Sequence, residues 1–400
     1  MMSKKSPQLR FEGFTDDWEE RKLGDVLSER NDQTPETNEY PLMSFVQGKG
    51  VTPKGERYNR SFLVKDSEKK YKKTELGDFI YSSNNLETGS IGFNRTGKAV
   101  ISPVYSIFKS KKSRESQFIG IMSARKDFIS KMVRFRQGVV YGQWRIHESD
   151  FLNIDMKMPN DKEQQLIISF FENIDKTIAL HQRKLDLLKE QKKGYLQKMF
   201  PKNGAKVPEL RFAGFADDWE VRKLNEVSDI YDGTHQTPKY QDNGVMFLSV
   251  ENIKTLTSNK FISREAFEDE FKIRPQRGDV LMTRIGDIGT ANVVETDEDL
   301  AYYVSLALFK SEELNPYFLQ ASIYAPFVQD QIWKRTLHIA FPKKINKNEI
   351  GQVPINVPTL AEQTKIGSFF KQLDKTIALH QRKLDLLKEQ KKGFLQKMFV

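Results

Sequence analysis

Hydrophobic residues recur in alternating steps of four and three positions in two stretches of the chain, with two polar residues completing the spacing in each. In the first stretch the positions are Ile174, Ile178, His181, Leu185, Leu188, Lys192, Tyr195 and Met199. In the second they are Leu373, Ile377, His380, Leu384, Leu387, Lys391, Phe394 and Met398. This spacing is typical of the seam of a coiled coil, so we predict two long, paired helices.

Both helices are predicted to begin upstream of the seam, near Glu163 and Glu362, because the hydrophobic face continues back to these positions. A proline lies shortly before each start, and Asn160/Asp161 or Thr359 can cap the helix that follows. A helix of this extent is roughly 55 Å long at about 1.5 Å per residue. The pair can therefore act as a long spacer.

The two helical stretches are copies of one sequence. Residues 175–194 (DKTIALHQRKLDLLKEQKKG) return unchanged as residues 374–393. An opening segment, Pro7–Val26, also returns with few changes as Pro208–Val227, and a Pro-x-x-x-Glu-Gln lead-in precedes each helix. The chain is therefore an internal duplication.

The blocks between the repeated parts, residues 27–158 and 228–357, differ greatly from each other. Short alternating hydrophobic runs bounded by Gly, Asn and Pro predict a mixed α/β domain in each block. Two faint correspondences remain: residues 77–79 (GDF) match residues 278–280 (GDV), and residues 90–92 (SIG) resemble residues 287–289 (DIG). One ancestral domain has kept its scaffold while its loops diverged.

Chain geometry predicts how the helices pair. The second domain begins a few residues after the first helix ends, and the second helix starts from that same domain. A parallel pair would require the second domain at both ends of a ~55 Å rod. We therefore predict an α+β chain with two mixed α/β domains separated by an antiparallel two-helix coiled coil with a pseudo-two-fold axis. The predicted boundaries are 1–160 and 202–359 for the domains, and 161–201 and 360–400 for the helical regions.

Composition and charge narrow the class of protein. Cysteine is absent and the five histidines lack ligand spacing, so we expect neither disulfides nor a metal site. No apolar run is long enough for a membrane span and the N-terminus does not look like a signal peptide, so we expect a cytoplasmic protein. The net charge is +10, and the repeated helices carry most of the excess. A solvated helix face explains this charge, and so does proximity to phosphates or to an acidic partner.

Six residues within the helices, three in each copy, are unusual for their positions. The seam positions His181/His380 and Lys192/Lys391 are polar, and such residues usually specify the register of a coiled coil. Gly194 and Gly393 lie inside the helical pattern, where glycine costs about 1 kcal/mol relative to alanine. Close approach of a partner helix and a local hinge both explain the glycines.

The repeated organisation resembles the specificity subunit of a type I restriction-modification system, in which two target-recognition domains alternate with two conserved helical regions. The resemblance covers the whole chain. Its most specific elements are the Pro-x-x-x-Glu-Gln lead-ins (Pro159, Glu163, Gln164; Pro358, Glu362, Gln363), the repeated helices, and the segments DGTHQTPKY (232–240) and RGDVLMTRIGDIG (277–289). The first block departs from this pattern because it lacks a DGTH counterpart.

The resemblance implies a division of labour. Each recognition domain would read one half of a bipartite double-stranded DNA target, and the coiled coil would set the spacer. The two identical helices would bind two modification subunits, which in the family are adenine methyltransferases, and restriction subunits would complete the complex. S-adenosylmethionine, ATP and Mg²⁺ would then serve the partner subunits, with no cofactor in this chain.

Base and phosphate contacts are expected from polar and basic residues in the loops of the two blocks. In the first block the candidates are Lys49, Asn84, Asn85, Arg95, Tyr141, Gln143 and Arg145. In the second block they are Thr234, His235, Lys239, Arg284, Arg335, His338, Lys343 and Lys344. Counting back from the lead-in prolines aligns residues 144–146 (WRI) with residues 343–345 (KKI). For each residue alone, a solvated surface position or a turn is the alternative interpretation.

Catalytic motifs are missing from the sequence. There is no phosphate-binding G-x-x-x-x-G-K-[ST] loop, no G-x-G-x-x-G, no Asn/Asp-Pro-Pro-aromatic motif of adenine methyltransferases and no zinc-protease or Ser/His/Asp signature. We therefore predict a non-catalytic chain that gives target choice to partner enzymes. The alternatives are a coiled-coil scaffold whose domains bind other proteins, and a self-sufficient restriction enzyme.

Overall fold

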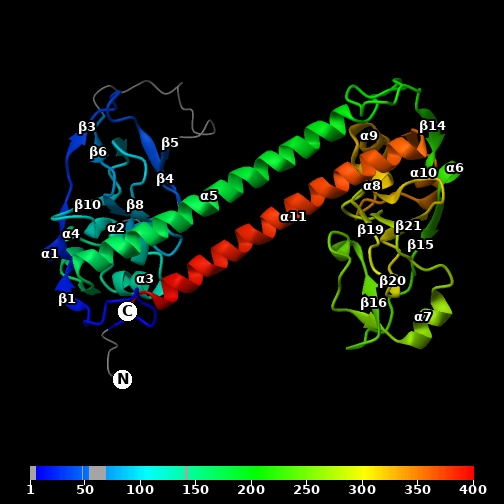
Figure 1. The fold of residues 1–400 in the computed structure, drawn as a ribbon. Helices are drawn as coiled ribbons and strands as arrows, with labels where there is room; N and C mark the ends of the chain where they lie inside the picture. The colour runs from blue at the N-terminus through cyan, green and yellow to red at the C-terminus, as the bar shows by residue number, and fades with distance from the viewer. Residues whose placement is uncertain (1–5, 47, 54–68, 140–142) are drawn as a thin grey trace. The chain divides into compact units, whose positions relative to one another are not determined.

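The computed structural model describes residues 6–46, 48–53, 69–139 and 143–400, and the chain divides into two units. Unit 1 contains residues 1–181 and 383–400, and unit 2 contains residues 182–382. Each unit therefore includes one α/β domain together with the beginning of one long helix and the end of the other (Figure 1). The described helices include none that is long and apolar enough to cross a membrane.

Unit 1 is built on a four-stranded antiparallel sheet in the order β2 (Leu27–Glu29), β10 (Ser106–Ser110), β7 (Phe79–Tyr81) and β8 (Ile91–Phe93). Strand β7 is buried along its whole length, and α2 (Glu115–Met122) packs on β7 and β8. The other elements are α1 (Leu23–Val26), α3 (Lys126–Val133), α4 (Glu148–Leu152), the 3₁₀ helix η2 (Ser83–Asn85), and the pairs β1 (Glu19–Lys22) with β13 (Asp155–Met158), β4 (Met43–Val46) with β5 (Gly50–Pro53) and β11 (Gln137–Val139) with β12 (Gln143–Arg145). A further sheet joins β3 (Gln33–Thr34), β6 (Tyr71–Thr74) and β9 (Ala99–Ile101).

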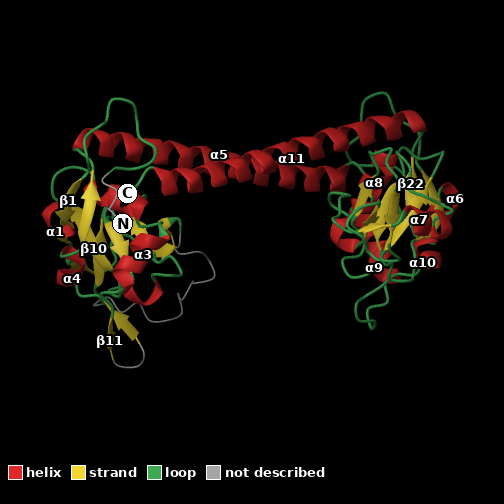
Figure 2. Ribbon diagram, turned by 90° about the horizontal axis from the view of Figure 1, so that it is seen from below, coloured by secondary structure: helices red, strands yellow, loops and turns green. Residues whose placement is uncertain are grey.

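Unit 2 repeats this plan with the order β15 (Asp229–Asp232), β21 (Leu306–Lys310), β18 (Val280–Thr283) and β19 (Ala291–Val293). Helix α8 (Pro316–Tyr324) packs on β18 and β19. It is followed by α9 (Pro326–Arg335), and Figure 2 labels both helices beside the strands of this unit. Helix α8 begins where Asn315 accepts two backbone N–H bonds and Pro316 presets the first turn. The other elements are α6 (Leu224–Val227), α7 (Arg264–Glu270), α10 (Lys347–Gly351), the 3₁₀ helix η4 (Val250–Asn252), the pair β14 (Glu220–Lys223) with β22 (Pro354–Val357), and the sheet β17 (Phe261–Ile262), β16 (Val245–Leu248), β20 (Leu300–Tyr302).

The two domains share hydrogen bonds as well as strand order. Asp78 accepts the backbone N–H of Glu75 at 2.7 Å, and Asp279 accepts that of Gln276 at the same distance. The match between residues 77–79 and 278–280 is therefore confirmed. The second predicted match is wrong: Tyr81 pairs with Ile91 whereas Met282 pairs with Ala291, so Ile91 corresponds to Ala291 and not to Ile288. The loop after β18 follows a different path from the loop after β7, so the Ile-Gly pair that the two domains share does not mark equivalent positions.

The repeated opening segments are tied to the helix starts by buried ion pairs. Arg10 donates two hydrogen bonds, of 2.7 and 2.8 Å, to the carboxylate of Glu163. Arg211 makes the same two bonds, at the same distances, to Glu362. The Glu163 side chain is fully buried and the Glu362 side chain is 1% exposed. The carboxylate raises the pKa of each arginine, mainly through these hydrogen bonds. In each copy, the glutamate of the Pro-x-x-x-Glu-Gln lead-in therefore binds the opening segment of the same copy.

Two 38-residue helices, α5 (Asp161–Lys198) and α11 (Leu360–Lys397), follow the lead-ins and begin two residues before the predicted starts. Asn160 accepts the N–H of Glu163 at 3.0 Å, and Thr359 accepts that of Glu362 at 3.4 Å. Both predicted caps are therefore confirmed.

The helices run antiparallel, as predicted. In unit 1 the ring of Phe170, early in α5, packs on Phe394, late in α11, with centroids 4.9 Å apart. In unit 2 Tyr195, late in α5, packs on Phe369, early in α11, at the same distance. The expected end-to-end separation of the two domains and the pseudo-two-fold axis stay predictions.

The seam positions lie on the inner side of the helix pair. All ten predicted interface residues are buried or half-buried: Ile178, His181, Leu185, Leu188, Tyr195, Ile377, His380, Leu384, Leu387 and Phe394. The seam lysines find acidic partners, because Lys192 binds Asp374 at 2.6 Å in unit 2 and Lys391 binds Asp175 at 2.5 Å in unit 1. Each pair joins the same two positions of the repeat, which fixes one antiparallel register.

Candidate nucleic-acid interface

Three loops of unit 2 carry the residues that the sequence singled out. The loop 233–239 follows β15, the loop 284–289 follows β18, and the hairpin 336–345 follows α9. Gly233 allows the first loop to pass close to the sheet, since a Cβ there would lie 2.3 Å from the carbonyl oxygen of Tyr302. The N–H of Thr234 donates to that same oxygen at 3.1 Å, which anchors the DGTH segment.

Arg284 connects these three loops through its buried side chain. Its guanidinium pairs with Asp232 at the start of the DGTH segment, and its Nε donates to the carbonyl of Ile345 at 3.1 Å. Its backbone carbonyl accepts the N–H of Ile345 at 2.9 Å. The side chain is only 8% exposed. Arg284, one of the predicted DNA-binding residues, is therefore enclosed by protein groups that connect the three loops.

The other candidates of unit 2 lie at the surface or close to it. His235, Lys239, His338, Lys343 and Lys344 are exposed, while Thr234 and Arg335 are half-buried. Beside the DGTH segment is a cleft of about 600 Å³ that Thr234, His235, Gln236, Lys272 and Lys347 help to line. Lys272 and Lys347 were missed by the sequence analysis, because nothing in their local sequence points to this cleft.

The hairpin rests on Trp333 of α9. The Nζ of Lys343 lies 4.8 Å from the centre of the Trp333 ring, and the His338 ring lies 4.0 Å from it. Leu337 donates its N–H to the carbonyl of Lys344 at 2.8 Å, which closes the hairpin base. Its tip contains Ile339 and Phe341, two hydrophobic residues that the sequence analysis did not select.

Unit 1 brings together an equivalent pair of segments. The backbone N–H of Trp144 donates to Asn84 at 2.6 Å, and that of Ile146 donates to Ser83 at 3.0 Å. Ile146 is fully buried, as is Ile345 in unit 2. This agreement supports the alignment of residues 144–146 with residues 343–345. Asn84, Asn85 and Arg145 therefore lie on one part of the surface.

The remaining unit 1 candidates are dispersed. Lys49 is exposed in the turn between β4 and β5. Arg95 stacks on Phe93, 4.4 Å from its ring centre, and binds Asp175 of α5 at 3.1 Å, so its guanidinium is already occupied beside the helices. Tyr141 lies outside the described residues, and Gln143 is described only as the first residue of β12.

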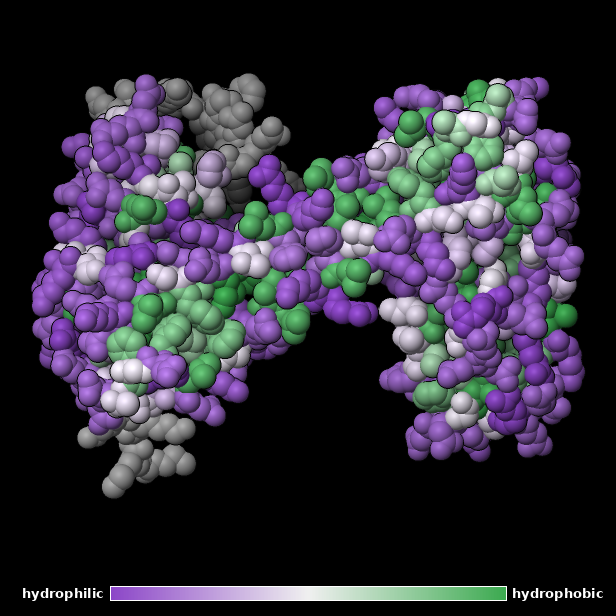
Figure 3. Space-filling view, in the orientation of Figure 1, coloured by the Kyte–Doolittle hydropathy of each residue, from purple (hydrophilic) through white to green (hydrophobic). Residues whose placement is uncertain are grey.

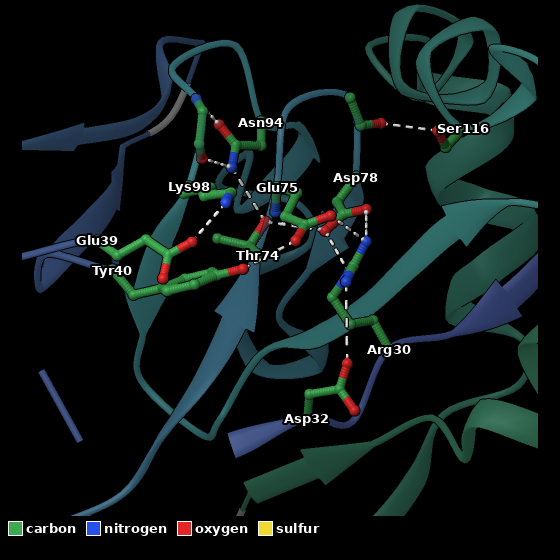
Figure 4. Close-up of polar contacts among 12 residues, drawn as sticks. Arg30, Asp32, Glu39, Tyr40, Thr74, Glu75, Asp78, Asn94, Lys98 and Ser116 are labelled. Carbon is green, nitrogen blue, oxygen red and sulfur yellow. Dashed lines mark hydrogen bonds and ion pairs between the residues drawn. The ribbon is translucent and has the colours of Figure 1, made fainter. Parts of the chain in front are cut away.

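A polar network in unit 1 connects Arg30, just after β2, with the loop before β7 (Figure 4). Arg30 binds Asp78 at 2.7 Å and Glu75 at 2.9 Å. The Tyr40 hydroxyl donates to Glu75 at 2.9 Å and thereby lowers the pKa of that carboxyl. Burial raises the pKa of Asp78. The network therefore stabilises the loop before β7.

Within the parts of the chain that the structure describes, no group of three or more His, Cys, Asp and Glu side chains could hold a metal ion. Figure 3 shows mainly hydrophilic surface on this face of each unit, with hydrophobic residues reaching the surface along the helices. Four exposed leucines occupy repeated positions there: Leu180 (68%), Leu379 (64%), Leu187 (50%) and Leu386 (49%).

Comparison with known proteins identifies the family. The model of the type I restriction modification DNA specificity domain matches residues 15–190 and again residues 216–389. The chain is 22% identical, over 95% of its length and 91% of the relative's, to the type I restriction enzyme MjaVIII specificity subunit of Methanocaldococcus jannaschii. It is 22% identical, over 95% and 92% of the two lengths, to the putative MjaX specificity subunit of the same organism.

Solved structures share the fold. The type I restriction-modification S subunit from M. genitalium superposes with a TM-score of 0.66 at 13% identity, covering 99% of both chains. A second structure, described as concerning complex assembly and conformational transition of the type I R-M system, superposes with a TM-score of 0.52 at 19% identity, covering 96% of this chain and 97% of the other. Since two matched specificity domains span most of the sequence, the chain belongs to the type I restriction-modification specificity family, whose members are non-catalytic DNA specificity subunits.

Proposed function

We propose that this chain selects a bipartite DNA target, with the domain of each unit reading one half-sequence and the paired helices setting the number of base pairs between them. The observation that carries the proposal is the contrast within the duplication. The helices are identical over residues 175–194 and 374–393, whereas the blocks 27–158 and 228–357 differ. The blocks and the helices have had equal time to change since the duplication, and only the blocks have diverged, which fits two different half-sites on one repeated frame.

The contacts to DNA come from the exposed members of the predicted set. In unit 1 these are Lys49, Asn84, Asn85 and Arg145, and in unit 2 His235, Lys239, His338, Lys343 and Lys344. Asn can bind adenine edges in the major groove and lysine can bind phosphates or guanine. Arg284 and Arg95 act as positioning residues because protein groups occupy them.

Two modification subunits bind the repeated helices. Each helix presents the same exposed leucines, at 180 and 187 or at 379 and 386, so one partner surface can be used twice. Exposed leucines at helical spacing are suited to burial against a partner. Restriction subunits join the same cytoplasmic complex, and S-adenosylmethionine, ATP and Mg²⁺ serve these partners and not this chain.

Co-expression with cognate modification subunits, followed by mapping of methylated adenines in host DNA, tests the proposal. The expected result is one motif with two specified halves separated by unspecified base pairs. Methylation within a continuous motif, or no methylation that depends on this chain, would refute it. Binding of the purified complex to a duplex of that motif should also weaken steeply between low and moderate salt, because phosphate contacts release counterions. A protein-binding scaffold would show no DNA affinity to lose.

A further inference from the structure

The tip of the hairpin 336–345 exposes two large hydrophobic side chains almost completely. Ile339 is 98% exposed and Phe341 is 104% exposed, relative to the reference for a free residue. Trp333 and Leu337, at the base, are 57% and 41% exposed. Single exposed hydrophobic residues are ordinary, but adjacent ones on a projecting tip indicate a surface that becomes buried in a complex.

The tip is held in place by hydrogen bonds at its base. Leu337 and Lys344 close the hairpin, and the carbonyl of Lys343 accepts the N–H of Gly286 at 2.9 Å. Below them Arg284 connects the hairpin to the DGTH segment through Ile345 and Asp232. The exposed side chains therefore lie on a hairpin whose base is fixed by hydrogen bonds, and the buried Arg284 connects this hairpin to the rest of the candidate interface.

The charge around the tip favours a polyanion as the surface that covers it. Residues 333–348 contain five basic side chains (Lys334, Arg335, Lys343, Lys344 and Lys347) and no Asp or Glu, although Lys334 pairs with Asp330 one helical turn earlier. Hydrophobic wedges flanked by cations are used by DNA-binding proteins that insert a side chain between base steps while Lys and Arg bind the phosphates. An anionic membrane surface would also attract such a tip, but its connection to the DGTH segment favours DNA.

Resting on the proposed function, we propose that Ile339 and Phe341 form a wedge that enters a groove of the half-site read by unit 2 and partly unstacks a base step there. Lys343 and Lys344 contact the phosphates on either side. The energy of unstacking depends on the base step, so the wedge contributes to sequence choice without a hydrogen bond to a base.

The test uses the complex of the full chain with its modification subunits and a duplex of the methylated motif mapped as above. 2-Aminopurine, which pairs with thymine, replaces one adenine at a time in the half-site that unit 2 reads, apart from the methylated adenine, whose extrusion by the modification subunit would itself raise the fluorescence. Wild-type complex should increase the fluorescence at one step, because unstacking relieves quenching. Phe341→Ala and Ile339→Ala should abolish the increase and weaken binding roughly ten- to a hundredfold, as is usual when a base-stacking side chain is removed. Phe341→Trp should retain both properties.

Val221→Ala is the matched control, since Val221 is also exposed (60%) in unit 2 but belongs to β14 and not to the hairpin. Unchanged melting temperatures of the variants would exclude misfolding, because neither tip residue packs in the core. A wild-type complex that binds the motif with no fluorescence change, or tip variants that bind and respond like wild type, would overturn the wedge and leave the proposed function intact. Binding of wild type, but not Phe341→Ala, to phosphatidylglycerol vesicles with DNA binding unaltered would also overturn it. Failure of the wild-type complex to bind the motif would instead refute the proposed function.

Discussion

Replacing Glu362 with glutamine should destabilise unit 2 more than any change to a surface ion pair. The Glu362 carboxylate is 1% exposed and accepts two hydrogen bonds, of 2.7 and 2.8 Å, from Arg211, which is itself 14% exposed. Breaking a buried pair by removing one partner costs about 3–5 kcal/mol, because the other charge loses its compensation. Arg211 also donates to the carbonyl of Asp217 at 2.8 Å, so we expect the lower end, about 3 kcal/mol.

The duplication supplies an internal comparison for this measurement. Glu163→Gln removes the equivalent bond to Arg10 and should destabilise unit 1 by a similar amount. Because two units need not unfold together, hydrogen exchange of the first turns of α5 and α11 should be followed across a urea series. With a slope of about 2 kcal/mol per molar urea, a loss of 3 kcal/mol lowers the midpoint by about 1.5 M.

A surface pair provides the control. Lys334 and Asp330 are 58% and 50% exposed, so Asp330→Asn should change the free energy of unfolding by less than about 0.5 kcal/mol. A midpoint for Glu362→Gln that falls within the range of this control would refute the argument that the lead-in glutamate organises the domain. So would equal destabilisation of both units by one substitution.

Three further predictions concern the helices and the unit 1 network. Lys192 and Asp374 form an ion pair of 2.6 Å, so Lys192→Asp should destabilise the helix pair. Adding Asp374→Lys should restore the melting temperature, and no recovery in the double variant would contradict this prediction. Gly194→Ala and Gly393→Ala should each stabilise the free chain by about 0.5–1 kcal/mol in thermal unfolding, since an added Cβ meets no atom within 4 Å. Lower melting temperatures of these variants would contradict the prediction. Tyr40→Phe should cost less than about 1 kcal/mol at pH 7, because Glu75 is partly exposed. The pKa of Glu75 is lowered in the folded state, so this contribution is present above the usual pKa of the carboxyl and is lost as the pH falls through the lower folded value. The urea midpoints of the two proteins should therefore converge as the pH falls below the usual pKa of glutamate, and a difference that grew would be inconsistent.

The helices could be predicted from the sequence because their signal is local. A seam of alternating steps and an identical repeat defined both helices to within two residues of their starts, and Asn160 and Thr359 indicated the caps. Chain connectivity then required an antiparallel pair. Each of these inferences used residues close together in sequence or a simple limit on length.

The loops could not be predicted to the same degree, because their contacts join distant residues. Nothing in the sequence around Arg284 distinguishes it from a surface arginine at the end of a strand. Its partners Asp232 and Ile345 lie 52 and 61 positions away along the chain. The ion pair of the lead-in glutamate could not be predicted from the sequence either, since Arg10 lies 153 positions before Glu163. Ile339 and Phe341 read as an ordinary hydrophobic run until the structure shows them at a tip.

Exchange of one recognition block tests the central claim most directly. A chain in which residues 228–357 are replaced by the equivalent block of another family member should be co-expressed with the same modification subunits, and its methylated adenines mapped in host DNA. We predict a motif in which one half is new while the other half and the spacer are unchanged. A motif that changes in both halves, or a spacer that changes although the helices are the same, would contradict the account.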